Sequence, residues 1–291
     1  MKVLIVGCGY VGLALGAELV RQGFAVSGLR RTRKADAEFA RFGIRSIVAD
    51  LTRPGSLPAI DRGYDWVVHC VSASGGELRE YREVYLEGTR HLLSWLSEAQ
   101  PRKLVYTSST GVYGQNDASL VDESSPTCPQ AGTSRVLVET EQLLLRAASE
   151  QNVPAVVLRV AGIYGPGRSY WLNRVRGGAV TIPEGEDRFL NMIHRSDVVG
   201  ALQAALARGQ PGQVYNAVDH EPVRLQALLE WLAARLGLPP PAVACAQQRA
   251  SGKRGLTNKR VSNRKLTEDL GYRFQFATFR EGYAALLDPQ V

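Results

Sequence analysis

Three glycines near the start of the chain have the spacing of a phosphate-binding turn. Gly7, Gly9 and Gly12 form a G-x-G-x-x-G pattern directly after the apolar run 3–6. Glycine at these positions allows a tight turn, a close approach of the backbone to a pyrophosphate, and close packing of the next helix on the strand. A flexible turn without a ligand is the alternative. We expect a dinucleotide to contact Gly7, Gly9, Tyr10, Val11 and Gly12, with its phosphates at the helix N-terminus.

The end of the second apolar run indicates which dinucleotide is bound. A site for NAD places Asp or Glu about 20 residues beyond the glycines, where the carboxylate holds the ribose 2′-hydroxyl. Here the run 25–29 is followed by Arg30 and Arg31, with no carboxylate. Two guanidinium groups suit a 2′-phosphate, so the sequence favours NADP among the NAD(P) cofactors. The alternative is that both arginines are solvated residues that open the next helix.

Further cofactor contacts are expected where later strands end. Asp50 and Leu51 follow the third run, and Asp50 could accept a hydrogen bond from the adenine amino group or simply form a turn or helix cap. Val71 and Ser72 lie at the end of the fourth run. Ligands of open parallel sheets bind beyond the carboxyl ends of the strands. We therefore assign all four residues to the cofactor site.

The elements that must position these residues alternate between strand and helix. Short β-rich runs lie at 3–6, 25–29, 46–48, 66–71, 103–106 and 155–158, and helical stretches lie between them at 10–22, 34–42, 80–96 and 134–150. Parallel strands need crossover connections, and strands buried on both faces are continuously apolar. The sequence therefore predicts an α/β protein with a Rossmann-type doubly wound parallel sheet.

The pattern changes after residue 162, which predicts a smaller C-terminal substrate lobe. A loop-rich stretch follows, and the chain then returns to strand and helix at 189–218 before an amphipathic helix at 225–236. We assign 1–165 and 192–218 to the NAD(P)-binding domain, and 166–191 and 219–291 to the smaller lobe. The cleft between them is the expected ligand site.

Composition and charge limit the partners. The 291 residues are 45% hydrophobic and carry 35 Lys and Arg against 28 Asp and Glu, a net charge of +7 that favours an anionic partner. Four cysteines without a C-x-x-C pair predict reduced thiols, no structural metal and a cytoplasmic location. No membrane span is expected.

The motifs together resemble one family along the whole chain. They are GCGYVG (7–12), DL (50–51), GT (88–89), SSTGVYG (108–114), LR (158–159), IYGPG (163–167), IHRSDV (193–198) and LGY (270–272). The chain is thereby similar to the extended short-chain dehydrogenases/reductases, the NAD(P)-dependent epimerase/dehydratase group. The resemblance implies an N-terminal lobe for the dinucleotide, a C-terminal lobe for a substrate that is often a nucleotide-activated sugar, and a homodimer.

The catalytic residues of that family are only partly present. The family uses Ser or Thr at the end of the fifth strand with a Tyr-x-x-x-Lys pair, in which Lys favours the phenolate and can hold the ribose. Ser109 matches the first position, but Thr133 stands at the Tyr position and Leu137 at the Lys position. An aliphatic hydroxyl is a far weaker acid than a phenol, and leucine has no charge. Tyr85 also departs from the family, where relatives commonly have Asn.

Two functions remain open. The first is a dinucleotide-binding protein that is not a dehydrogenase, such as a sensor. The second is an NADP-dependent oxidoreductase or epimerase on a small, phosphorylated, nucleotide-sugar-like substrate, with Ser109 polarising a carbonyl and Tyr113 or Tyr164 donating a proton. Arg159 lies on a strand expected to be buried and needs an acid or a carbonyl as its partner.

A basic segment near the C-terminus has several interpretations. Seven cations lie between 249 and 265 without an acid. The run is consistent with a solvated loop. It is also consistent with a pocket wall that faces a diphosphate substrate. Nucleic acid is disfavoured, because the segment has no interleaved aromatic residues and matches no DNA-binding motif.

Overall fold

A seven-stranded parallel sheet forms the centre of the computed structural model, which describes residues 1–58, 63–178, 180–183, 187–244 and 257–288. Each neighbouring pair of strands in this sheet is parallel. From one edge to the other the strands are β12 (Val214–Ala217), β7 (Ala155–Val160), β5 (Lys103–Ser109), β4 (Trp66–His69), β1 (Lys2–Val6), β2 (Ala25–Arg30) and β3 (Arg45–Val48).

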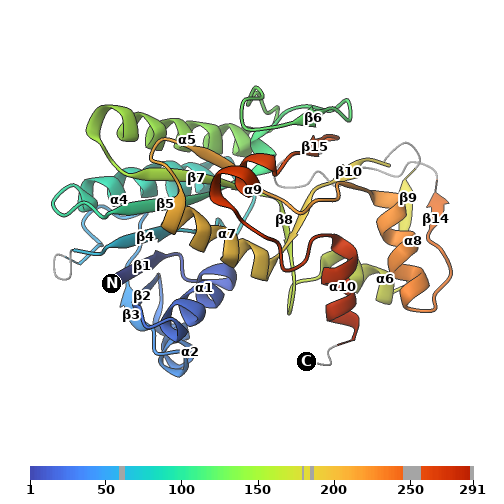
Figure 1. The fold of residues 1–291 in the computed structure, drawn as a ribbon, viewed down its shortest axis with the longest axis horizontal. Helices are drawn as coiled ribbons and strands as arrows, with labels where there is room; N and C mark the ends of the chain where they lie inside the picture. Colours follow the sequence, from blue (N-terminus) through green and yellow to red (C-terminus); the bar gives the residue numbers. More distant parts are fainter. Residues whose placement is uncertain (59–62, 179, 184–186, 245–256, 289–291) are drawn as a thin grey trace.

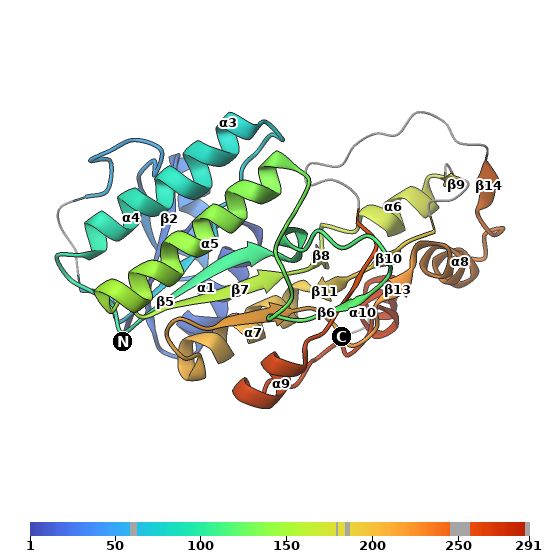
Figure 2. The same cartoon turned by 90° about the horizontal axis from the view of Figure 1, so that it is seen from above.

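Helices cover both faces of the sheet, as Figures 1 and 2 show. On one face lie α3 (Leu78–Tyr81), α4 (Gly88–Leu96) and α5 (Gly132–Gln151), and on the other lie α1 (Tyr10–Arg21), α2 (Asp36–Arg41) and α7 (Arg195–Arg208). The strand order reverses between β1 and β4, which is the switch point at which such folds bind ligands. The prediction of a doubly wound Rossmann-type sheet is confirmed.

Side chains of the central strands account for the core. The four residues Val3 to Val6 of β1 have no exposed surface, and β7 is buried along its whole length. Strands buried on both faces lose the alternation of polar and apolar residues, which is why these runs were recognisable in the sequence. β5 is longer than its apolar run, because Thr107, Ser108 and Ser109 continue the pairing with β7. This pairing places Ser109 at the end of the strand.

The helical stretch after β4 is not uniform. Between α3 and α4, residues Arg82–Glu87 widen into π-helical turns. The Thr89 hydroxyl donates to the Tyr85 carbonyl at 2.5 Å, four residues earlier. π-Helical turns are rare in proteins, and a large share of those that occur lie at functional sites.

A second buried cluster lies at the end of the molecule remote from β3 (Figure 1). It contains α6 (Tyr170–Arg176), α8 (Leu225–Arg235) and α10 (Phe279–Leu287), which pack through Leu172, Leu228 and Phe279 among others. The short strands of this region are β9 (Thr181–Pro183), β10 (Phe189–Leu190), β13 (Val223–Arg224) and β14 (Ala242–Ala244). β8 (Gly162–Tyr164) pairs with β11 (Met192–His194) and joins this region to the sheet.

One part of the tail packs on the larger core. β15 (Arg260–Val261) pairs with β6 (Leu120–Val121), and α9 (Arg264–Leu270) contacts β12 and α7. Leu266 and Leu270 are members of the larger buried cluster. The division into 1–165 with 192–218 and 166–191 with 219–291 stays a prediction, and 260–270 is the segment that lies across it. No helix among the described residues has both the length and the apolar character of a membrane span.

Candidate functional site

The turn after β1 has a geometry that depends on glycine. Gly7 has a φ of +83°, and a Cβ atom added to it would lie 2.6 Å from the Val71 backbone. A Cβ at Gly12 would lie 2.9 Å from Ile5 Cγ2, so this glycine lets α1 approach β1. The amides of Gly7 and Cys8 both donate to the Leu29 carbonyl at 3.1 Å. Packing of the protein itself therefore explains the first and third glycines of the motif.

The second glycine has a different environment. A Cβ at Gly9 would meet no protein atom closer than 3.8 Å. No clash with the protein therefore requires glycine here, and the absent side chain leaves space at the N-terminus of α1. This is the space that a pyrophosphate needs above a helix N-terminus. The turn thus fits a dinucleotide.

A first cavity of about 550 Å³ extends from this turn over the ends of β2 and β3. Arg30, Arg31 and Thr32 line one part of it, and Asp50 and Leu51 line another. The Arg30 Nε donates to the Cys8 carbonyl at 2.5 Å, and its guanidinium lies 5.5 Å from the Phe39 ring centre. These two contacts hold the cation beside the glycine turn.

The other polar residues of this cavity are placed differently. Arg31 is exposed, and its Nη2 lies 3.3 Å from Ser74 Oγ. Asp50 Oδ1 accepts from the Thr52 amide at 3.0 Å and from the Thr52 hydroxyl at 2.8 Å, so Asp50 forms the turn that was one of its two predicted roles. Its contact with adenine stays a prediction.

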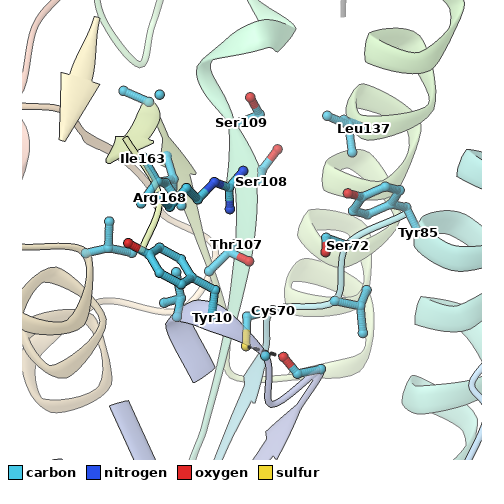
Figure 3. Close-up of a pocket in the computed structure, with 18 residues that line it drawn as sticks. Tyr10, Cys70, Ser72, Tyr85, Thr107, Ser108, Ser109, Leu137, Ile163 and Arg168 are labelled. Atoms are coloured by element: carbon cyan, nitrogen blue, oxygen red, sulfur yellow. Dashed lines mark hydrogen bonds between the residues drawn. The ribbon is translucent and has the colours of Figure 1, made fainter. Parts of the chain in front are cut away.

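A second cavity of about 450 Å³ continues on the other side of the glycine turn (Figure 3). It shares Gly7, Gly9, Val71 and Ser72 with the first cavity, so the two form one groove. In Figure 3, Tyr10 and Arg168 lie on one side, Leu137 and Tyr85 on the opposite side, and Ser109 at one end. Of the eleven residues predicted to bind the cofactor, ten line this groove and Gly12 packs beneath the turn. Their contact with a cofactor stays a prediction.

The three residues at the expected catalytic positions lie differently with respect to the groove. Ser109 lines the second cavity, and its Oγ accepts from the Gly111 amide at 3.1 Å. Leu137, at the position where we expected an ammonium group, also lines the cavity and presents an aliphatic side chain. Thr133 is buried and is not among the residues that line the cavity. Helix α5 thus brings neither a phenol nor an amine to the groove.

The two tyrosines expected to substitute as proton donors lie elsewhere. The Tyr113 hydroxyl donates to Asn216 Oδ1 at 2.9 Å and accepts from Arg159 Nη1 at 2.8 Å, and burial raises its pKa to about 12. Tyr164 stacks on Tyr283 with ring centres 4.5 Å apart, and burial raises its pKa as well. Neither lines the groove, so the prediction that one of them donates a proton there is wrong. Both sit near strand ends in sequence, but packing turns their rings into the core.

The buried arginine on β7 forms an ion pair with a buried acid. Arg159 Nη2 lies 2.7 Å from Glu141 Oε2, with the two side chains 6% and 2% exposed. The Ser108 hydroxyl donates to the same carboxylate. This ion pair confirms the prediction of an acid or carbonyl partner, and its acid comes from α5.

Two residues of the groove were missed by the sequence analysis. Arg168 lines the second cavity, and its guanidinium lies 5.5 Å from the Tyr10 ring centre. The Tyr10 hydroxyl donates to the Pro166 carbonyl at 3.0 Å, which ties the start of α1 to the loop that carries Arg168. The G-P-G motif at 165–167 was the available signal. Tyr85 was noted only as a departure from the family, although its ring lines the same cavity.

Comparison with known proteins identifies the family. The profile of the NAD dependent epimerase/dehydratase family matches residues 3–217. The chain belongs to this family. The family is NAD-dependent, so membership supports a dinucleotide cofactor for this chain.

Several known proteins are similar to most of the chain. Protein YeeZ of Escherichia coli K12 is 29% identical over 94% of this chain and 96% of its own. A 3-diazoavenalumate denitrifying reductase from a Streptomyces species is 31% identical over 83% of each chain. The solved structure of a conserved protein of unknown function from Silicibacter pomeroyi has a TM-score of 0.82 at 30% identity and covers 98% of both chains.

The basic segment is only partly described. Arg249, Lys253 and Arg254 lie outside the described residues. Lys259 is 3% exposed, and its ammonium group donates to Thr257 Oγ1. Burial, together with the charge of Arg188, lowers its pKa to about 8. Lys259 is therefore not part of a solvated loop.

Proposed function

We propose that the groove binds NADP(H) and that the protein is a reductase of the epimerase/dehydratase family. The cofactor part rests on one observation, which is that Arg30 and Arg31 line the first cavity beside the end of β2. β2 ends in arginine, with no carboxylate there to receive a ribose 2′-hydroxyl. A phosphate at that position would meet two guanidinium groups.

The reaction part rests on the second cavity. When bound, NADPH supplies a hydride. Ser109 is placed to donate a hydrogen bond to a carbonyl or similar acceptor, and Arg168 is the cation among the residues that line this cavity. Its positive charge would stabilise negative charge that develops on the substrate. Because α5 provides no activated phenol as a proton donor, this arrangement suits a hydride acceptor whose developing negative charge is stabilised by Arg168.

The proposed substrate is small and anionic. Arg168 lines the second cavity and forms no ion pair with another described residue. A phosphate or carboxylate on the substrate would supply the opposite charge for this guanidinium group. A reductase among the relatives agrees with this class of reaction.

One titration and one assay test this proposal. Purified protein is titrated with NADPH and NADH by calorimetry, and nicotinamide absorbance is then followed with a panel of anionic carbonyl compounds that includes sugar nucleotides. We expect tighter binding of NADPH and its oxidation by at least one compound, with slower turnover in Ser109→Ala. Equal binding of both cofactors would contradict the NADP assignment.

A dinucleotide sensor is the second candidate. Its support is that Leu137 and the buried Thr133 stand where the resemblance places the proton-transfer pair, while the residues expected to bind the cofactor lie around one groove. Tight NADPH binding with no turnover on any acceptor, and no effect of Ser109→Ala, would favour the sensor over the reductase.

A further inference from the structure

Tyr85 contributes a phenol to the wall of the second cavity. It lies on the π-helical turns 82–87, and its oxygen is directed into the second cavity opposite Tyr10 (Figure 3). Val71 and Ser72, which line the cavity with Tyr85, also line the adenine side of the groove. Tyr85 therefore stands just past the point where the two cavities join.

The hydrogen bonds of the cavity leave the proton of Tyr85 uncommitted. The Tyr85 oxygen accepts from the Ala73 amide at 3.3 Å, and no described residue receives its proton. Three neighbouring hydroxyl groups are already donors within the protein, on Tyr10 to Pro166, on Thr107 to the His69 carbonyl, and on Ser108 to Glu141. A buried hydroxyl that faces a cavity with an unused proton is a donor for a ligand.

The surroundings hold the Tyr85 ring in place. It packs against Tyr81 with ring centres 5.0 Å apart and is 3% exposed. Its carbonyl accepts from the Thr89 hydroxyl, which in turn lies 2.9 Å from His69 Nε2. Because the backbone and the ring are both fixed, little conformational freedom is lost when the hydroxyl binds a ligand.

We propose that the Tyr85 hydroxyl donates a hydrogen bond to a hydroxyl group of the nicotinamide ribose. A pyrophosphate at Gly9 leaves the second cavity to the nicotinamide half of the cofactor, and the ribose follows the pyrophosphate directly. Leu137 offers no polar atom from the α5 side of this cavity. Tyr85 is thus the residue that positions the nicotinamide half. This inference rests on the cofactor part of the proposed function.

The test measures how one substitution changes the affinity for each of two ligands. NADP⁺ and adenosine 2′,5′-bisphosphate share the adenine half, but only NADP⁺ has the nicotinamide ribose. We expect Tyr85→Phe to weaken NADP⁺ binding about fivefold, the loss of one hydrogen bond between neutral groups. Binding of the bisphosphate should not change. Titration calorimetry measures both affinities without any turnover.

Tyr81→Phe is the matched control, because Tyr81 is similarly buried and packs against Tyr85 without lining the cavity. It should bind both ligands as the native protein does. Unchanged NADP⁺ binding by Tyr85→Phe would overturn the inference, and so would an equal loss for both ligands, which would mean that the hydroxyl only supports the loop at Ala73. Failure of the native protein to bind either ligand would instead overturn the proposed function, and this inference with it.

Discussion

Glu141 and Arg159 form a buried ion pair, with 2.7 Å between Oε2 and Nη2. Glu141 comes from α5, the helix on which the resemblance led us to expect the proton-transfer pair, and it points at the sheet. Arg159 in turn donates to the Tyr113 hydroxyl, which is why that phenol is unavailable to the groove. The charged side chain that α5 contributes to the interior is therefore a carboxylate, and it is held in an ion pair with Arg159.

We predict that Glu141→Ala destabilises the protein by about 3–5 kcal/mol, because it leaves the Arg159 guanidinium buried without its counter-ion. Denaturant unfolding measures this loss. Arg235→Ala removes an ion pair with Asp288 in which both side chains are largely exposed, and it should cost less than about 1 kcal/mol. Similar losses in the two variants would contradict the argument.

Substitutions at Gly7 and Gly9 should have different effects, the first mainly on stability and the second mainly on cofactor binding. Gly7→Ala forces a left-handed backbone and a 2.6 Å contact with Val71, and should lower the free energy of unfolding by about 2 kcal/mol or more. Gly9→Ala meets no such contact and should lower the free energy of unfolding by less than Gly7→Ala does. The methyl group added by Gly9→Ala would instead fill the space proposed for the pyrophosphate and weaken NADP⁺ binding at least about tenfold. Calorimetric titration and denaturant unfolding of both variants check this contrast.

Cofactor selectivity should depend on Arg31. Removal of a charge-assisted hydrogen bond to the 2′-phosphate should weaken NADP⁺ binding about tenfold in Arg31→Ala and leave NAD⁺ binding unchanged. Arg33 is a suitable control, since it is exposed and paired with Asp36 outside the groove. If Arg33→Ala has the same effect, the general positive field, and not a specific contact, determines the preference.

Stability should fall in mild acid in part because of His194. Burial, aided by Arg195, lowers the pKa of His194 to about 4, below the ordinary value of 6.5. The unfolded chain therefore takes up the proton first, so the stability is complete above pH 6.5 and is lost as the pH falls toward 4. The loss from this residue should reach about 1–2 kcal/mol near pH 5.

The comparison for this prediction is His194→Asn, measured by denaturant unfolding across the same pH range. Asn can still accept from the Ser196 amide, as His194 Nδ1 does, but it does not titrate. Other titrating groups, such as Asp219 with its raised pKa, cancel between the two proteins. Identical pH profiles would show that His194 does not contribute.

The candidate site was predictable where function depends on neighbours in sequence. Gly7, Gly9 and Arg30 were all assigned from their distance to an apolar run, and the structure places them around one groove. Tyr113 and Tyr164 were misplaced by the same reasoning, because a position near a strand end does not determine which way a large ring turns. Tyr113 turns to Arg159, which is 46 positions away in the chain.

The sequence by itself determined the sheet and the glycine turn. These features are local, since continuous apolar runs, positive φ angles and single residue types do not depend on distant partners. Only the tertiary structure decided that Glu141 neutralises Arg159, that Arg168 reaches the groove beside Tyr10, and that the Tyr85 hydroxyl faces the cavity. Such contacts join residues far apart in the chain, and their geometry follows from how helices pack on the sheet.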